Sequence, residues 1–501
     1  MNLIRKFLGI SLLSPLILVA PSEAKVTNTD KLLIKNITIV SPKQTVTAGA
    51  ADVYIDNGRI LRIGKDLDVK VDQMIDGSGQ FLTPGLIDSH THLNGVPGMS
   101  YAQQQENSVI ASLAAQQIPL SYLYHGFTTV MDLHSNAESV AQWNQQAIRP
   151  TAYFCGAAPV VDGYPMSFVP KPFRYHITPY FIAEGGLIPA GIDPTQHTPS
   201  AVLSRMKADG AICAKTHYEP GFGASKNLPL PSKKLIMELK DEAQRQGLKL
   251  LLHANSERAY RFGLEVGVDA FVHGVWHWNN ASTGRMSQEL STLLNAGIKQ
   301  GASVQPTTQV LFAERDLHNP KYLEQKALKQ VLPRELIDWY ASEQGQAPRK
   351  RMSKFPFVAN LLETGQWEQI NAAGIARLNS MFRYWVKNNG SLLFGSDTPS
   401  DVTYANPPGL NGRLEMARWQ DVGVKPEQFL AAATIDNARF FNIDVDVGSV
   451  EVDKTADLLI LDEDPRESIE AFDSIKWVIT KGNAIERQAL SANRKRESSQ
   501  Q

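Results

Sequence analysis

The chain has 501 residues, of which 43% are hydrophobic and 20% are charged, and its 50 basic and 51 acidic residues give a formal net charge of −1. These values are typical of globular proteins and exclude a chain dominated by disorder. No stripe of Lys and Arg favours nucleic acid or a membrane surface as a partner. The length accommodates a large α/β barrel together with a small second domain.

The first 24 residues have the pattern of a secretory signal peptide. A basic start at residues 1–6 precedes an apolar run at residues 7–20, and Ser22, Glu23 and Ala24 fit the small-x-small rule for cleavage after Ala24. The run is shorter than the roughly 20 residues that span a bilayer. We therefore expect a cleaved leader rather than an anchor, and a mature protein that is secreted or periplasmic and free of the membrane.

The chain has two cysteines, Cys155 and Cys213. An oxidising compartment would permit a disulfide between them. Each lies in an apolar, strand-like run, where Cys is readily buried as a small hydrophobic residue. The sequence favours two buried thiols and leaves the bridge open.

Both ends of the chain are rich in predicted strands. Residues 32–40, 51–57, 59–63 and 80–82 alternate, and Asn57-Gly58 between two of these runs is a strong hairpin signal. Residues 456–462 and 475–480 continue this style near the other end. We predict a small β-sandwich built from residues 25–83 and 441–486, followed by a disordered tail at residues 487–501.

The segment between these ends, residues 84–440, alternates strand and helix. Helical patterns at residues 233–246, 257–266 and 287–296 separate several of the runs. Eight strand–helix repeats predict an α/β fold, namely a (β/α)8 TIM barrel. Residues 158–205 and 308–385 are too long for simple crossovers, so we expect them to be insertions that cap the C-terminal face. The eight predicted strands are residues 86–92, 127–133, 151–156, 211–217, 248–253, 270–273, 302–307 and 392–397.

Polar side chains follow the apolar runs of five of these strands. In a TIM barrel, chemistry gathers at the C-terminal ends of the strands. Residues two apart on a strand point to the same face, so His90 and His92 could hold one ion together. Imidazole and carboxylate ligands suit zinc or a similar divalent ion. The strand-end residues are His90, His92, Lys215, His217, His253, His273 and Asp397.

These motifs resemble the amidohydrolase superfamily, in its prolidase-like and imidazolonepropionase-like branches. The run from Pro84 to His92, Pro-Gly-Leu-Ile-Asp-Ser-His-Thr-His, is similar to the strand-one signature of that family. His253 and His273 match its strand-five and strand-six histidines, and Asp397, in Gly-Ser-Asp-Thr-Pro, matches its strand-eight aspartate. Residues 432–438 and 448–462 resemble the family's return to its small β domain.

The resemblance implies a metal centre and a mechanism. A lysine at the end of strand four, here Lys215, is carboxylated in the family and bridges two divalent ions. Those ions are held by His90, His92 and Asp397 on one side and by His253 and His273 on the other. Zinc is the first candidate, and manganese and iron would accept the same ligands. A bridging hydroxide would attack a carbonyl while Asp397 moves the proton to the leaving nitrogen.

Other residues near the site have competing interpretations. Tyr218 could donate to the oxyanion, or it could simply pack. His217 competes with Lys215 as a ligand, and we place it in the second shell or facing the substrate. His134 and His277 could line the pocket. Ser256 occupies the position where related deaminases carry a glutamate, which argues against deamination.

The leading hypothesis is a metal-dependent amidohydrolase that hydrolyses a C–N bond other than an internal peptide bond in a small-molecule substrate. A dipeptide or N-acyl amino acid is one such substrate. The alternatives are a lactonase or phosphotriesterase-type esterase and a non-catalytic binding protein with a vestigial site. The sequence does not decide the metal, the substrate or whether the chain forms a homo-oligomer.

Overall fold

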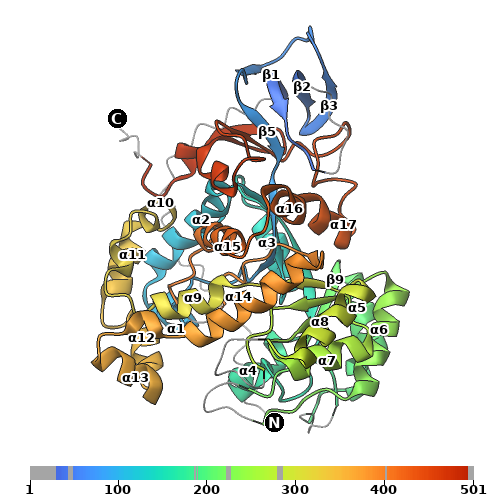
Figure 1. The fold of residues 1–501 in the computed structure, drawn as a ribbon, viewed down its shortest axis with the longest axis vertical. Coiled ribbons are helices and arrows are strands. Elements are labelled where there is room, and N and C mark those ends of the chain that lie inside the picture. The colour runs from blue at the N-terminus through green and yellow to red at the C-terminus, as the bar shows by residue number, and fades with distance from the viewer. Residues whose placement is uncertain are drawn as a thin grey trace, which may run out of the picture.

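The structure is a computed structural model that describes residues 30–42, 49–184, 188, 190–221, 227–278, 286–400 and 403–494. Its strands form two sheets, one wholly parallel and one mixed. The blue strands β1–β3 and the red C-terminal segment lie together at the top of Figure 1, above the helices and strands of the middle of the chain. The predicted signal peptide lies outside the described residues.

The parallel sheet contains eight strands in the order β13-β12-β11-β10-β9-β8-β7-β6. The order follows the chain, as it must in a barrel built from successive strand–helix units. All eight strands begin within two residues of the predicted positions. The strands are β6 (Leu86–Thr91), β7 (Phe127–Asp132), β8 (Thr151–Ala157), β9 (Cys213–His217), β10 (Lys249–His253), β11 (Ala270–Val272), β12 (Ser303–Gln305) and β13 (Ser391–Leu392).

The first and last strands of this sheet are joined to each other by backbone hydrogen bonds. Ser89 N donates to Phe394 O at 3.1 Å, and beyond β13 Asp397 N donates to His90 O at 2.8 Å. These bonds close the sheet, and the predicted TIM barrel is confirmed. The eighth strand is shorter than predicted because residues 393–398 are joined to β6 by isolated backbone hydrogen bonds rather than by a regular ladder.

Helices cover the outside of the barrel and fill the two long insertions. Ser232 and Ser256 cap the N-termini of α6 and α7, and Gly247 and Gly267 end them in the left-handed conformation, so both helices match their predicted bounds. The helices around the barrel are α1 (Tyr101–Glu106), α2 (Ser108–Tyr124), α3 (Ala137–Asn144), α5 (Pro199–Ala208), α6 (Lys233–Gln246), α7 (Glu257–Val266), α8 (Gln288–Gln300), α15 (Leu410–Asp421), α16 (Pro426–Ala431) and α17 (Asn437–Phe440).

The two predicted insertions have different contents. The first carries α4 and short turns, and the second carries a run of helices that flanks the barrel at the left and bottom of Figure 1. Among the described residues, no helix is both long and apolar enough to cross a membrane. The insertion helices are α4 (Lys171–Ile177), α9 (Gln309–Asp316), α10 (Leu328–Val331), α11 (Arg334–Ala341), α12 (Ala347–Met352), α13 (Pro356–Glu363) and α14 (Ala372–Lys387).

The small β domain is built from both ends of the chain, as predicted. Its strands form one mixed sheet in the order β16-β15-β14-β5-β1-β2-β3, with β4 paired to β1. Asn57 and Gly58 both have positive φ, as a tight two-residue hairpin between β2 and β3 requires. The strands are β1 (Lys31–Ile39), β2 (Ala50–Asp56), β3 (Arg59–Gly64), β4 (Gln73–Asp76), β5 (Phe81–Pro84), β14 (Leu458–Leu461), β15 (Ile475–Thr480) and β16 (Asn483–Glu486).

The prediction of a disordered tail is wrong for residues 487–494. A short 3₁₀ turn spans Arg487–Leu490, and Leu490 is fully buried. Gln117 of α2 donates to the carbonyl of Leu490 at 3.0 Å and accepts from Arg494 at 2.8 Å. Burial of this apolar side chain against α2 holds the polar segment in place. Residues 495–501 lie outside the described part of the chain.

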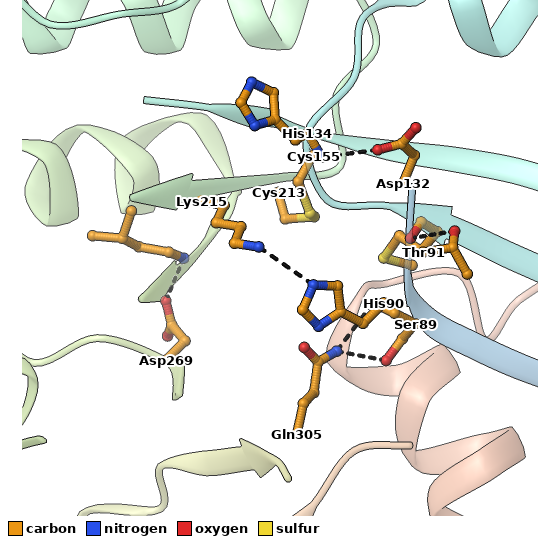
Figure 2. The surroundings of a disulfide bond; sticks show 12 residues. Ser89, His90, Thr91, Asp132, His134, Cys155, Cys213, Lys215, Asp269 and Gln305 are labelled. Atoms are coloured by element: carbon orange, nitrogen blue, oxygen red, sulfur yellow. Dashed lines mark hydrogen bonds between the residues drawn. A yellow bond between two sulfur atoms is a disulfide. The ribbon is translucent and has the colours of Figure 1, made fainter. Parts of the chain in front are cut away.

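Cys155 and Cys213 form a disulfide, so the expectation of two free thiols is wrong. The two residues are direct partners in the β8–β9 register, and their Cα atoms are 4.5 Å apart. Figure 2 shows the bridge beside Lys215, which lies two residues further along β9 and therefore on the same side of the strand. The sequence could not place the cysteines opposite each other because the pairing register is a tertiary property.

Removal of this bridge is expected to destabilise the barrel. The cysteines are 58 residues apart in sequence. On the chain-entropy model a loop of that size corresponds to a loss of about 4 kcal/mol in the Cys155→Ala/Cys213→Ala variant. Urea unfolding followed by circular dichroism measures the change. A reductant should shift the wild type toward the variant and leave the variant unaffected; a variant as stable as the oxidised wild type would contradict the expectation.

Candidate metal centre

Asp397 is the meeting point of three predicted ligands. Its Oδ1 lies 3.2 Å from His90 Nε2 and 3.2 Å from His92 Nε2, and its Oδ2 lies 3.9 Å from His273 Nδ1. His90, His273 and Asp397 present ligand atoms within 4.8 Å of one another and could hold a metal ion. The side chains come from strands one, six and eight, and the closed barrel brings them together.

Close packing at the seam between β6 and the eighth strand places His90. A Cβ atom on Gly395 would lie only 2.7 Å from the Cβ of His90, so this approach requires glycine. The buried Asp88 carboxylate accepts from His90 N at 3.2 Å and from Ser396 N at 2.9 Å. Burial raises the pKa of Asp88 to about 7, even though these hydrogen bonds oppose the shift.

Lys215 reaches from β9 into the same cluster. Its Nζ lies 3.3 Å from His90 Nε2, and Figure 2 shows this contact across the barrel. The side chain is buried, and burial lowers the pKa of the Lys215 amine to about 8. A larger share of this amine is therefore unprotonated at neutral pH than for an ordinary lysine.

His253 and His273 form the other side of the cluster. Nδ1 of His253 lies 3.1 Å from Nε2 of His273, while Nδ1 of His273 contacts Thr307 Oγ1 at 2.7 Å. Burial lowers the pKa of both imidazoles, which favours the neutral form that binds metals. All six predicted side chains thus lie in one connected cluster of contacts.

His92 differs from the other histidines in its charge state. Burial would lower its pKa, but contacts with Asp132 and Asp397 outweigh this effect and raise the pKa to about 9. The two carboxylates therefore favour the protonated form of His92. A metal ion that uses His92 must displace this proton.

The sequence patterns did not predict two of the carboxylates at this centre. Asp132 ends β7 and places Oδ1 3.7 Å from His92 Nδ1, and its strand-end position could have revealed it. Glu219 follows β9 in a loop, is buried, and lies 3.5 Å from His253 Nε2. Its carboxylate also accepts from Asn255 at 2.8 Å and from Gly221 N at 2.9 Å. No strand pattern extends to Glu219, so only the structure reveals it.

Aromatic and imidazole rings from β9 and the first insertion surround His253. The ring centroid of Tyr164 lies 4.8 Å from that of His253 and 5.5 Å from that of His217. The ring centroids of His134 and His217 are 6.3 Å apart. The first insertion therefore covers this side of the centre, as expected, and His217 and His134 lie where a substrate could meet them.

Tyr218 makes the contacts of a packing residue. Its ring stacks on Phe262 of α7 with centroids 4.2 Å apart, and the guanidinium of Arg258 lies 5.6 Å from its centroid. These contacts favour the packing alternative over the oxyanion role.

A family model described as "Amidohydrolase family" matches residues 81–274 and 369–485, which is more than half of the chain. The chain belongs to the amidohydrolase family. The match includes every residue of the six-member cluster and the return to the small β domain. The predicted family resemblance is therefore confirmed, and members of this family typically bind divalent metal ions.

Curated relatives of this amidohydrolase align over short stretches. A 5-methylthioadenosine/S-adenosylhomocysteine deaminase of Caldanaerobacter subterraneus is 31% identical over 132 residues, which are 23% of this chain and 30% of that protein. A dihydroorotase of Aquifex aeolicus is 33% identical over 101 residues, which are 20% of this chain and 21% of that protein. The alignments thus span less than a third of either relative.

A solved structure is similar over a longer part of the chain. A Xaa-Pro dipeptidase with bound methionine in its active site superposes with a TM-score of 0.59 at 20% sequence identity, covering 91% of this chain and 100% of the other. At this identity the likeness concerns the fold alone, and it agrees with a barrel that carries a small β domain.

Proposed function

We propose that this amidohydrolase is a metal-dependent hydrolase of a C–N bond other than an internal peptide bond, acting on dipeptides or N-acyl amino acids. The observation that supports this proposal is the convergence of His90, Lys215, Asp397 and their histidine partners at one end of the barrel. A buried lysine, a carboxylate and four histidines are costly to hold together without a ligand that uses them.

The donor set fits a pair of divalent cations. His90, His92 and Asp397 would hold one ion, and His253 and His273 the other, with carboxylated Lys215 between them. Zinc is the first candidate because neutral imidazoles with one carboxylate are ligands that it accepts readily. When bound, the ions supply an activated water near neutral pH and polarise the scissile carbonyl.

The residues of the chain itself supply proton transfer and positioning. Asp397 Oδ1 lies between His90 and His92 and would accept the proton of the attacking water and return it to the leaving nitrogen. His217 and Tyr164 flank His253 and would contact the substrate. Ser256 accepts a hydrogen bond from Ala259 N as the cap of α7, which leaves no proton-transfer role for it.

The proposal on substrates draws support from a structural neighbour. The Xaa-Pro dipeptidase acts, as its name says, on a dipeptide, and its fold covers 91% of this chain. The names of the deaminase and dihydroorotase relatives likewise describe reactions at C–N bonds.

A substrate panel on the zinc-loaded protein tests the proposal. We expect N-acyl amino acids and dipeptides to be hydrolysed, with about two ions per chain by elemental analysis, and protein treated with a chelator serves as the control. Turnover of lactones or phosphotriesters alone would favour the esterase alternative. Protein without metal or turnover would favour a binding protein.

Glu219→Gln is expected to weaken metal binding. The carboxylate lies 3.5 Å from His253 Nε2 and would keep the ring proton on that nitrogen. The unprotonated Nδ1 would then be free to bind a cation. Loss of such a partner costs roughly 10–100-fold in metal affinity. Competition with a chromogenic chelator measures the change, and Glu265→Gln on the exposed face of α7 is the control. Equal affinity in both variants would contradict this role.

We further propose that the protein acts outside the cytoplasm, in the periplasm or the medium, on the evidence of its first 24 residues and its disulfide. Fractionation of cells that express the full chain, with N-terminal sequencing of the product, tests this. A cytoplasmic protein that retains residues 1–24 would overturn it.

A further inference from the structure

A cavity of about 550 Å³ lies where the loops after β10 and β11 meet α7 and α14. None of the six clustered side chains lines it, so it is separate from the metal centre. Its lining consists of Ser256, Glu257, Arg258, Arg261, His277, Trp278 and Arg377.

The charge of this lining is strongly positive. Three arginines face one carboxylate, Glu257, in a chain whose net charge is −1. Arg261 is paired, because its Nη2 lies 3.1 Å from Glu257 Oε1. Arg258 and Arg377 have no carboxylate partner among the residues that the structure describes. Two guanidinium groups are therefore available to an anion.

Both of these guanidinium groups are held in place. Arg258 lies over the ring of Tyr218, 5.6 Å from its centroid. The Nε of Arg377 donates to the backbone carbonyl of Trp276 at 2.5 Å, and this bond leaves its two Nη groups free. These contacts restrict the two side chains, Arg258 being exposed and Arg377 half-buried, and such restriction lowers the conformational entropy that binding a ligand costs. The planar fork of arginine suits a carboxylate.

Trp278 also lines this cavity. Its side chain is only 7% exposed, and its buried indole Nε1 has no hydrogen-bond partner in the described part of the chain. A buried donor without an acceptor is costly unless a ligand supplies one. The nitrogen itself is not exposed to the cavity, so the two arginines are the groups open to a ligand.

Short chain segments connect the cavity to the metal centre. Ser256 follows His253 by three residues, and His277 follows His273 by four, so each lies within about 11–14 Å of its histidine. The two loops are tied together, since Glu257 N donates to His277 O at 3.0 Å. A small molecule with its scissile bond at the histidines can thus extend toward the cavity.

We propose that this cavity binds a carboxylate at the end of the substrate remote from the scissile bond. Arg258 and Arg377 hold the two oxygens. The assignment rests on the proposed hydrolase function and narrows its substrates to acids. Substrates with a neutral end would lose these contacts.

Binding of a non-hydrolysable acid tests the site without turnover. Calorimetry on the zinc-loaded protein compares 4-phenylbutyrate with 4-phenylbutan-1-ol. Arg258→Gln and Arg377→Gln should each weaken binding of the acid about 10–100-fold, the range for charge-assisted hydrogen bonds, and leave the alcohol unchanged. Arg383→Gln, on α14 with its Nη2 on the Asp421 carbonyl, is the control and should change neither.

Hydrolysis provides a second readout. For N-acetyl-6-aminohexanoic acid, whose carboxylate is remote from the scissile bond, the two variants should raise KM and leave kcat nearly unchanged, whereas the matching amide should respond to neither variant. If both variants bound 4-phenylbutyrate as tightly as the wild type, the carboxylate would bind elsewhere and the assignment would be overturned. Equal losses of affinity for the acid and the alcohol would overturn it as well. A protein that binds 4-phenylbutyrate through the two arginines but hydrolyses nothing would refute only the hydrolase.

Discussion

Lys215→Met is expected to leave the protein with at most one metal ion per chain and to reduce kcat/KM by more than about 100-fold. Removal of a residue that only contacts a metal ligand already lowers metal affinity or activity by roughly 10–100-fold, and Lys215 is a proposed ligand itself. The methionine preserves the length and burial of the side chain, so the barrel should fold. It cannot be carboxylated, and the oxygen ligand between the two proposed ion positions is lost. Elemental analysis and steady-state kinetics on matched preparations measure both effects.

The pKa of Lys215 makes the formation of that ligand dependent on pH. Burial lowers the pKa to about 8, so the unprotonated amine that adds carbon dioxide increases as pH rises through this value rather than near 10.5. At fixed dissolved carbon dioxide, zinc loading should speed up about tenfold per pH unit below 8 and level off above it. Lys215→Arg stays protonated and serves as the control. Loading that is equally fast at pH 6.5 and 8.5, or unaffected by removal of carbon dioxide, would contradict carboxylation.

The strand-end histidines were predictable because their positions follow from local patterns. Each of His90, His253 and His273 ends an apolar run, and parallel strands bring such ends to one face of the barrel. The helix bounds were equally local, because Ser256 and Gly267 are sequence signals for the two ends of α7. The family resemblance added Lys215, whose role no spacing rule would assign.

What the sequence could not predict depends on tertiary register. Cys155 and Cys213 became a disulfide because β8 and β9 align them as direct partners. Glu219 reaches His253 from a loop with no periodicity, and Arg377 joins the cavity near α7 from a helix more than a hundred residues away. These contacts bring together segments that no local pattern relates to each other.

Asp397→Asn separates proton transfer from binding at the centre. The substitution preserves shape and the hydrogen-bonding oxygen but removes the negative charge and the basic site. Burial alone would raise the pKa of Asp397, yet the surrounding histidines lower it well below its ordinary value, which favours the charged carboxylate. We expect kcat at saturating zinc to fall by about 10²–10⁴-fold, the share of a general acid–base group, with a smaller change in KM.

Asp132→Asn is the matched control because Asp132 also contacts His92, at 3.7 Å, but from the side away from Asp397. It should weaken zinc binding and leave kcat at saturating zinc within about tenfold of the wild type, as expected for a residue that only orients a ligand. If the two variants lost kcat equally, Asp397 would act through the position of His92 rather than as the proton acceptor. If Asp397→Asn retained full kcat, another base would have to serve, and the buried Glu219 beside His253 would be the next residue to test.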